Sequence, residues 1–188
     1  MRKDYVDLYG KNAANGASID TTTTETEIFR IPIPADELQD GKKFEGSAFF
    51  KYSTTGTPTL ILGVRAVARA AAATTGVLLA KSEAMTTPSG AASFMGRITF
   101  QFTVRLNGAT GTLMCVGEAT LYAGVAPTVG SATGAPAVSA MGSAGAAVPA
   151  EVTVDFTVDK DLLLTAKWSA SSASNALIGL DASIARMN

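Results

Sequence analysis

The stretch "FMGRITFQFTVRLNGATGTLMCVGEATLY", residues 94–122, decides the fold class. Its first half alternates strictly between apolar and polar residues. The expected inward side chains are Ile98, Phe100, Phe102, Val104 and Leu106, and the expected outward ones are Arg97, Thr99, Gln101, Thr103 and Arg105. A period of two predicts a half-buried β-strand. "NGATG" at 107–111 predicts a tight turn, so the whole stretch is expected to form a hairpin.

The same period recurs on both sides of this hairpin. Further strands are predicted in "EIFRIPIP" (27–34), "KKFEGSAFFKYS" (42–53), "TPTLILGVRAVARA" (57–70) and "AEVTVDFTVDKD" (150–161). In the last of these the expected inward side chains are Val152, Val154, Phe156 and Val158. "TGVLLAKSE" (75–83) is too short for its period to decide between strand and helix.

The stretch "LLLTAKWSASSASNALIGLDASIARMN", residues 162–188, predicts a closing hairpin whose turn is "SASSASNA". The residues expected to share its buried faces are Leu162, Leu164, Ala166 and Trp168 on one strand, and Ile178, Leu180, Ala182 and Ile184 on the other. Trp168 is expected to fill the core near the turn; an exposed ring for ligand stacking is the alternative. Together these segments predict an all-β fold: an antiparallel two-sheet sandwich, jelly-roll-like, of about eight strands.

Two segments do not fit the strand pattern. Residues 1–26 are polar and predict an extended N-terminal arm, followed by the sandwich domain over 27–188. Residues 123–150 are rich in Ala and Gly, carry no charge, and predict a long loop within that domain. Each segment is either mobile or a contact with another subunit. The proposed partner contacts are Tyr5, Leu8 and Tyr9 in the arm and Val125, Val129, Val138, Met141 and Val148 in the loop. We expect removal of residues 1–20 to leave the fold intact.

Composition limits the possible chemistry. The 188 residues include 15 basic and 16 acidic ones, so a basic face for nucleic acid is not expected. The chain has no histidine, which excludes His-dependent triads and His-ligated metal sites. The one cysteine, Cys115, cannot form an intrachain disulfide and is expected to be buried and inert. No apolar run approaches 18 residues, and the first 18 residues lack the apolar core of a secretory signal, so neither a membrane span nor secretion is expected.

Clustered carboxylates are the only candidates for catalysis. They occur at Asp36, Glu37 and Asp40 in "ADELQD" and at Asp159 and Asp161 in "VDKD". A glycoside hydrolase needs two carboxylates that flank a substrate bond. These acids lie among turn residues at strand ends, where solvated carboxylates are the simpler interpretation. The spacing of a calcium-binding loop is missing, so no metal and no cofactor is expected.

Three stretches carry a resemblance to a known class of proteins. They are "GSAFFKYSTTGTPTLILGVRA" (46–66), "ITFQFTVRLNGATGTLMCVGEATLY" (98–122) and the closing stretch at 162–188. In this order they resemble small virion proteins of tailed bacteriophages, and most closely the jelly-roll head decoration (cement) proteins.

The resemblance implies a non-enzymatic structural protein on the capsid surface of the virion, made in the host cytoplasm. It further implies a homotrimer that binds the major capsid protein and stabilises contacts between capsid subunits. Two alternatives stay open: a tail or head fibre module that binds a host receptor or glycan, and a glycoside hydrolase on a sandwich fold. The aromatic content of 7% counts against a fibre module.

Overall fold

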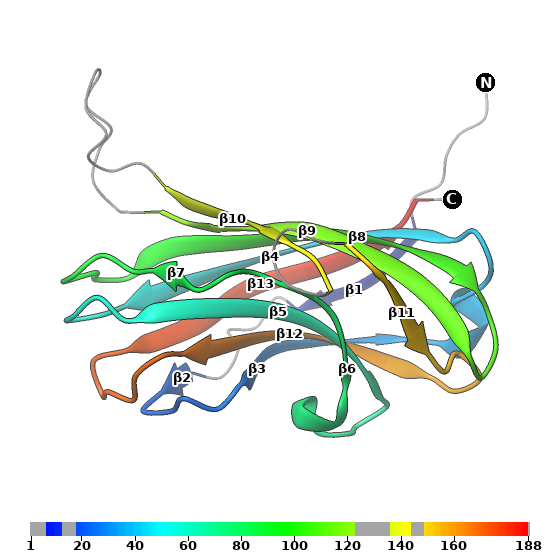
Figure 1. Ribbon diagram of the computed structural model, residues 1–188, viewed down its shortest axis with the longest axis horizontal. Helices are drawn as coiled ribbons and strands as arrows, with labels where there is room; N and C mark the ends of the chain where they lie inside the picture. The colour runs from blue at the N-terminus through cyan, green and yellow to red at the C-terminus, as the bar shows by residue number, and fades with distance from the viewer. Residues whose placement is uncertain (1–6, 13–17, 123–135, 144–148, 188) are drawn as a thin grey trace, which may run out of the picture.

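The computed structural model describes residues 7–12, 18–122, 136–143 and 149–187, which form two antiparallel β-sheets packed face to face (Figure 1). The eight-stranded sheet contains β1 (Asp7–Asn12) and β2 (Ser18–Asp20) beside β13 (Ala176–Arg186), then β4 (Lys43–Ser53), β8 (Phe94–Leu106) and β9 (Gly111–Leu121), with β10 (Ala137–Met141) and β11 (Glu151–Val154) beside β9. The five-stranded sheet contains β3 (Thr26–Ile33), β12 (Lys160–Trp168) and β5 (Thr59–Ala68), with β6 (Val77–Lys81) and β7 (Met85–Thr86) beside β5. Two short 3-10 helices, η1 (Ala35–Glu37) and η2 (Ala73–Thr75), lie in the connections.

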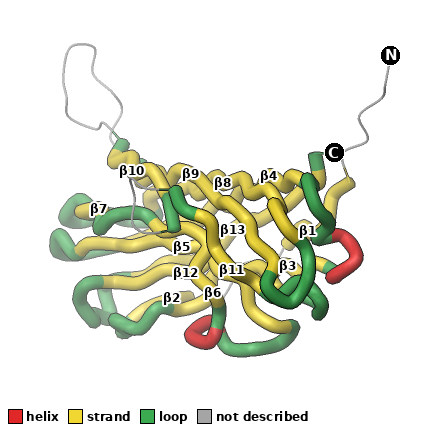
Figure 2. Tube along the Cα trace, turned by 45° about the vertical axis from the view of Figure 1, so that its right-hand side comes forward, coloured by secondary structure: helices red, strands yellow, loops and turns green. Residues whose placement is uncertain are grey.

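The predicted all-β, two-sheet antiparallel sandwich is confirmed. Neighbouring strands such as β13 and β4, or β12 and β3, are far apart in sequence, which is the kind of connection that a jelly roll uses. The described residues contain thirteen strands rather than about eight, in part because three of the four sheet edges consist of two short strands each: β1 and β2, β10 and β11, and β6 and β7 (Figure 2). Short edge strands limit pairing with other chains.

The core lies between the sheets, and β4 and β8 show how it is filled. Large and small residues alternate across this pair: Gly46 lies opposite Phe100, and Phe50 lies opposite Gly96. A Cβ atom on either glycine would come within 2.2 Å of the facing ring. Phe44 and Phe102, also paired, stack with their centroids 4.7 Å apart. The glycines of "KFEGSAF" and "FMGRITF" are therefore packing residues on buried faces.

In β13 the side chains that face the core are not all the predicted ones. A bulge between Gly179 and Asp181 shifts the register of β13 against β4. As a result Leu177 is buried, whereas Ile178 and Leu180, predicted to point inward, are half-buried. A bulge adds one residue and moves the following side chains to the other face. Beyond the bulge, Ala182 and Ile184 are buried, as predicted.

Two other inward predictions are wrong. Val158 is 47% exposed because β11 ends at Val154 and the chain turns before β12. Leu106 is 51% exposed at the last residue of β8, beyond a register shift after Val104. Val154 and Phe156 are buried in the core, as predicted.

The two irregular segments contain regular structure in their described parts. Within 1–26, β1 and β2 both pair with β13 of the same chain. Ile19 is buried in the core, and the Trp168 indole donates a 3.3 Å hydrogen bond to its carbonyl. Removal of residues 1–20 would break these interactions, so the structure gives a reason to expect that this truncation weakens the fold. The outcome stays a prediction. Trp168 is fully buried, which confirms its predicted place in the core.

Within 123–150, β10 pairs with β9, and Gly142 forms a bridge with Lys81 at the end of β6. This bridge joins the two sheets along one side. The predicted loop therefore contains a strand. Its sequence "AVSAM" alternates too weakly, with alanine at two of five positions, for the period to show.

Candidate functional site

The outer face of the eight-stranded sheet carries a polar surface where β4, β8 and β9 run side by side. Glu45 lies opposite Gln101, and Thr99 lies opposite Glu118, all on the solvent side of the sheet. Their neighbour Val116 is paired with Gln101. The side chains are set on regular, hydrogen-bonded strands, which hold them in fixed relative positions.

These side chains line a solvent-open hollow of about 390 Å³. Its lining residues are Glu45, Thr99, Phe100, Gln101, Val116, Gly117 and Glu118. A second hollow of about 240 Å³ adjoins it toward β13. The second is lined by Glu45, Gly46, Ser47, Arg97, Thr99, Ser183, Ala185 and Met187. Because Glu45 and Thr99 line both, the two hollows form one surface, which we call the outer polar surface.

Most hydrogen-bonding groups of the outer polar surface are not used by the protein. Within the described part of the chain, the side chains of Glu45 and Gln101 make no hydrogen bond, and Glu118 only accepts a long one of 3.4 Å from Thr120. A carboxylate accepts hydrogen bonds at two oxygens, and an amide both donates and accepts. The surface therefore presents hydrogen-bond donors and acceptors toward solvent.

An apolar area adjoins the outer polar surface at the far end of β8. The Arg97 guanidinium lies 5.7 Å from the centroid of the Phe49 ring, its partner on β4. The Tyr122 N–H donates a hydrogen bond to the Met95 carbonyl, so these two residues lie side by side. Both are exposed, and so is Val138 on β10. We call Met95, Tyr122 and Val138 the apolar corner. Exposed apolar side chains on neighbouring strands are a candidate contact with another molecule.

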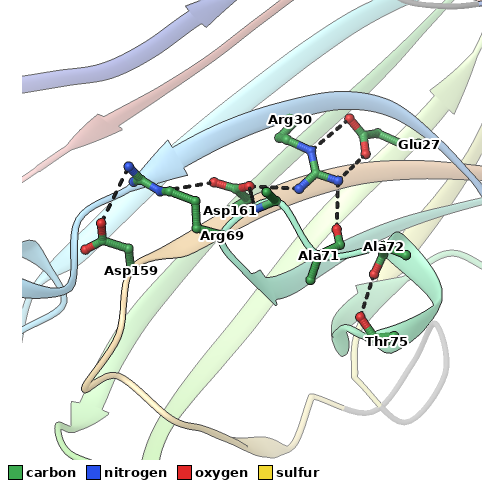
Figure 3. A network of polar contacts seen from close by, with 9 residues as sticks. Glu27, Arg30, Arg69, Ala71, Ala72, Thr75, Asp159 and Asp161 are labelled. Carbon is green, nitrogen blue, oxygen red and sulfur yellow. Dashed lines mark hydrogen bonds and ion pairs between the residues drawn. The ribbon is translucent and has the colours of Figure 1, made fainter.

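The outer face of the five-stranded sheet carries a network of ion pairs instead (Figure 3). Asp161, whose side chain is 4% exposed, accepts a 2.8 Å bond from Arg30 and lies 3.7 Å from Arg69. It also accepts the N–H of Ala70, a residue at a φ of 62°, where side chains are rarely found. Arg30 in turn binds the Ala71 carbonyl. The network fastens the 69–76 connection to the sheet.

The predicted acid clusters thus have structural roles. Asp161 is buried and paired, which corrects its interpretation as a solvated acid; Asp159 is half exposed and lies 3.5 Å from Arg69. Glu37 pairs with Arg186, and Asp40 accepts the backbone N–H of Asn107. Within the described residues, each acid of the two predicted clusters except Asp36 has a basic side chain or a backbone N–H as its partner.

The proposed partner contacts are only partly within the described residues. Tyr5, Val125, Val129 and Val148 lie outside them. Leu8 and Tyr9 belong to β1, whose backbone pairs with β13, and Val138 is 55% exposed on β10. Met141, at the end of the same strand, is buried in the core at 2% exposure, so its side chain packs within its own chain. Contact of these residues with a partner stays a prediction.

Sequence reasoning missed the residues of the outer polar surface. Gln101 and Thr99 face outward, as predicted, but the sequence patterns did not single out Glu45 or Glu118 as site residues. Their grouping depends on β4 lying beside β8, a pairing between strands separated by β5, β6 and β7. The only hint in the sequence is that Glu45 in "KKFEGSAFFKYS" occupies an outward position of its strand, as Gln101 does in its own.

Other chemistry finds little support in the described residues. They contain no group of three or more Cys, Asp or Glu side chains placed to hold a metal ion. Burial raises the pKa of the Cys115 thiol to about 12, so it stays protonated and unreactive at neutral pH, as predicted. No helix in the described part of the chain is long and apolar enough to cross a membrane.

Comparisons with known proteins add distant likenesses only. No protein-family model matches this chain, and no curated protein matches it. Among solved structures, the CBM2 module of the evolved Dit of Lactobacillus casei BL23 phage J-1 is 10% identical, with a TM-score of 0.29, over 83% of this chain and 67% of that one. Lectin I from Ulex europaeus, in complex with the methyl glycoside of α-L-fucose, is 8% identical, with a TM-score of 0.39, over 96% and 92%. The Lotus tetragonolobus seed lectin is 10% identical, with a TM-score of 0.36, over 97% and 92%. Function is therefore inferred from this chain's own surfaces.

Proposed function

We propose that this protein is a non-enzymatic binding module of a bacteriophage virion and that its outer polar surface binds a neutral glycan. This is the fibre-module alternative of the sequence interpretation. The observation that carries it is a set of hydrogen-bonding side chains that line two adjoining hollows on regular strands and of which Glu45 and Gln101 make no hydrogen bond within the described residues.

The chemistry of these side chains matches a sugar. Each hydroxyl of a pyranose both donates and accepts, so carboxylate, amide and hydroxyl groups side by side can bind adjacent sugar hydroxyls. Glu45 and Gln101 are direct neighbours across β4 and β8 and supply such a pair. Val116, beside Gln101, offers an apolar contact for the ring face. Sites of this kind combine apolar contact with a few placed polar groups.

Charge decides the class of glycan. The larger hollow contains two carboxylates, Glu45 and Glu118, and no basic side chain. A uronic acid or sialic acid would bring a like charge next to them, which is unfavourable. A neutral sugar, by contrast, gains charge-assisted hydrogen bonds from its hydroxyls to the carboxylates.

The apolar corner supports a second candidate function, capsid decoration. Met95 and Tyr122 are exposed side by side, and Val138, which is paired with Thr120 of β9, is exposed on the neighbouring strand β10. Apolar and aromatic side chains are enriched at protein–protein contacts. In this reading the protein forms a homotrimer and binds the major capsid protein through this corner, which extends the prediction made from the sequence resemblance.

A glycan array followed by calorimetric titration tests the first candidate. We expect saturable binding to at least one neutral glycan, and about tenfold weaker binding by Glu45→Gln and Gln101→Ala. Glu151→Gln is the matched control, because Glu151 lies outside the lining of both hollows and forms only a 3.7 Å ion pair with Arg105.

Failure of the glycan proposal has a defined form. It fails if no neutral glycan binds, or if binding is unchanged in both surface variants. Binding to purified phage heads that is lost in Tyr122→Ser and Val138→Ser would then favour capsid decoration. Gold-labelled protein on intact particles separates the two further, since label on the facets indicates decoration and label at the tail or fibres indicates a receptor module.

A further inference from the structure

The five-stranded sheet has a hollow of its own, of about 160 Å³, on its outer face. Its floor is Gly63 on β5. Lys81 on β6 and Thr165 on β12 lie directly opposite Gly63 on its two sides. Ile61 and Arg65 flank it along β5, and Glu25, Leu78 and Lys167 complete the wall.

The empty space depends on the missing side chain of Gly63. A Cβ atom there would lie 2.7 Å from the Thr165 hydroxyl oxygen and 3.4 Å from the nearer carboxylate oxygen of Glu25. Any other residue would fill the floor and push these groups aside. The hollow thus forms because Gly63 of β5 lies between Lys81 of β6 and Thr165 of β12.

One acid and one base in this hollow are bound to each other. Glu25 accepts two bonds of 2.7 Å from Arg65 and one of 2.6 Å from the Thr165 hydroxyl. Arg65 also donates to the Gly76 carbonyl at 2.8 Å. The pair is held by several hydrogen bonds, and its charges cancel.

The two lysines differ from this pair. Neither the Lys81 nor the Lys167 ammonium makes an ion pair or a side-chain hydrogen bond within the described residues. The hollow is lined by three basic side chains, Arg65, Lys81 and Lys167, and by one acid, Glu25, so basic groups outnumber acidic ones there. The outer polar surface on the opposite sheet has the reverse charge in its larger hollow.

We infer that the Gly63 hollow is an anion-binding site for a single carboxylate or phosphate group, with Lys81 and Lys167 as its charge partners. The Arg65–Glu25 pair forms one wall of the hollow, and the Thr165 hydroxyl lies at the edge of its floor. Lysine ammonium groups suit phosphate and carboxylate as compact point charges. Such a group could belong to a sugar acid of a polysaccharide or to a phosphate ester. The inference is independent of glycan binding on the other sheet.

Titration of the full-length protein, followed by NMR chemical shifts, tests the site with three probes: inorganic phosphate, glucuronate and, as neutral control, glucose. We expect saturable shifts in the residues around Gly63 with phosphate or glucuronate at about millimolar affinity, weakening with added salt, and none there with glucose. Stronger binding of glucuronate identifies a sugar acid as the source, and stronger binding of phosphate identifies a phosphate ester. Shifts of equal size at scattered surface lysines, without saturation, would show an adventitious ion only and would overturn the proposal.

Two variants and a control make the test specific. Lys81→Gln and Lys167→Gln are each expected to weaken the anion about fivefold, and the double variant more than either. Arg105→Gln removes the same charge from the opposite sheet and should leave the affinity unchanged. Equal loss in all three, or no loss in the lysine variants, would overturn the proposal. Neutral-glycan binding should persist in the lysine variants, so failure here is distinguishable from failure of the outer polar surface.

Discussion

The indole N–H of Trp168 donates a hydrogen bond to the carbonyl of Ile19, a residue 149 positions earlier in the chain. Ile19 is buried, and the strand it belongs to, β2, pairs with β13 directly after the turn that follows Trp168. The beginning of the chain therefore closes the end of the sandwich where the last two strands meet. Residues before the main body of the domain are part of its core.

Removal of residues 1–20 should destabilise the fold rather than trim an arm. The truncation deletes Ile19 and uncovers the edge of β13, and loss of one buried aliphatic side chain alone costs about 2–5 kcal/mol. We expect a lower midpoint in urea and a red shift of tryptophan fluorescence, because water reaches Trp168. Trp168 is the only tryptophan, so a Trp168→Phe variant serves as the blank for this signal. Unchanged emission and midpoint in the truncated protein would contradict the role of β2.

Gly46 should tolerate no side chain. Its Cβ would lie 2.2 Å from the ring of Phe100, which is buried between the sheets and cannot move aside without disturbing its neighbours. Overpacking of this kind typically costs about 1–3 kcal/mol, so Gly46→Ala should lower the free energy of unfolding by that amount. Gly56→Ala is the matched control, since nothing lies within 4 Å of its Cβ position and its φ is ordinary. Urea denaturation of both variants measures the difference, and equal stability would disprove the packing argument.

Asp161 should contribute more to the free energy of unfolding than an exposed acid that also pairs with an arginine. Asp161→Asn keeps the shape but removes the charge that faces Arg30 and Arg69 and weakens the acceptor for the Ala70 N–H. Hydrogen bonds to charged groups contribute about 1.5–3 kcal/mol, and we expect a loss in that range.

Glu151→Gln provides the comparison for Asp161→Asn, because its ion pair with Arg105 is half exposed and 3.7 Å long. We expect a change of less than about 0.5 kcal/mol. Similar losses in the two variants would show that the network on the five-stranded sheet contributes little. Thermal melting measured on both variants under the same conditions gives the answer.

The sequence predicts the sandwich because β4, β8 and much of β5 alternate between apolar and polar residues, and a chain with several long half-buried strands has few other ways to bury them. It does not predict which residues of β13 face inward before the bulge between Gly179 and Asp181, because a bulge leaves no mark in the pattern. β10 and β2 are short and poor in large apolar residues, so their pairing depends on long-range contacts that a local period cannot report.

The candidate sites depend even more on tertiary structure. Glu45 and Gln101, or Gly63 with Lys81 and Thr165, become neighbours only through strand order and register. In the sequence, Gly63 is one glycine in "LILGVRA" and Lys81 one lysine in a segment of undecided structure. What the sequence did indicate was the class of each side chain and the face it occupies.

Cys115 should react only when the protein unfolds. It is fully buried on β9, and burial raises its pKa to about 12, so at pH 8 almost no thiolate is present. We expect no labelling by a thiol reagent in the native state at pH 8 and complete labelling in guanidinium chloride. Because it is the only cysteine, one thiol per chain is expected. Fast labelling of the native protein would show that the β9 region opens readily.

The Glu25–Arg65 pair should make stability depend on pH in the acid range. Burial alone would raise the pKa of Glu25, but hydrogen bonds from Arg65 and Thr165, with the charges of Arg65 and Lys167, outweigh it and lower the pKa below its ordinary 4.5. A carboxyl whose folded pKa is lower than its unfolded pKa stabilises the protein above the unfolded value and loses that contribution as pH falls through the folded value. The stabilisation is therefore full above about pH 4.5 and disappears below it.

Glu25→Gln should accordingly be less stable than the wild type at pH 7, and the two proteins should become more similar as pH falls below 4.5. At pH 7 we expect a difference of about 1–2 kcal/mol, since a partly exposed, charge-assisted pair is replaced by a neutral contact. Urea unfolding at a series of pH values measures both curves. A difference that stays constant from pH 7 to pH 3 would mean that the variant acts by altered packing and not by loss of the ionised carboxylate. Glu151→Gln, carried through the same series, should run parallel to the wild type throughout.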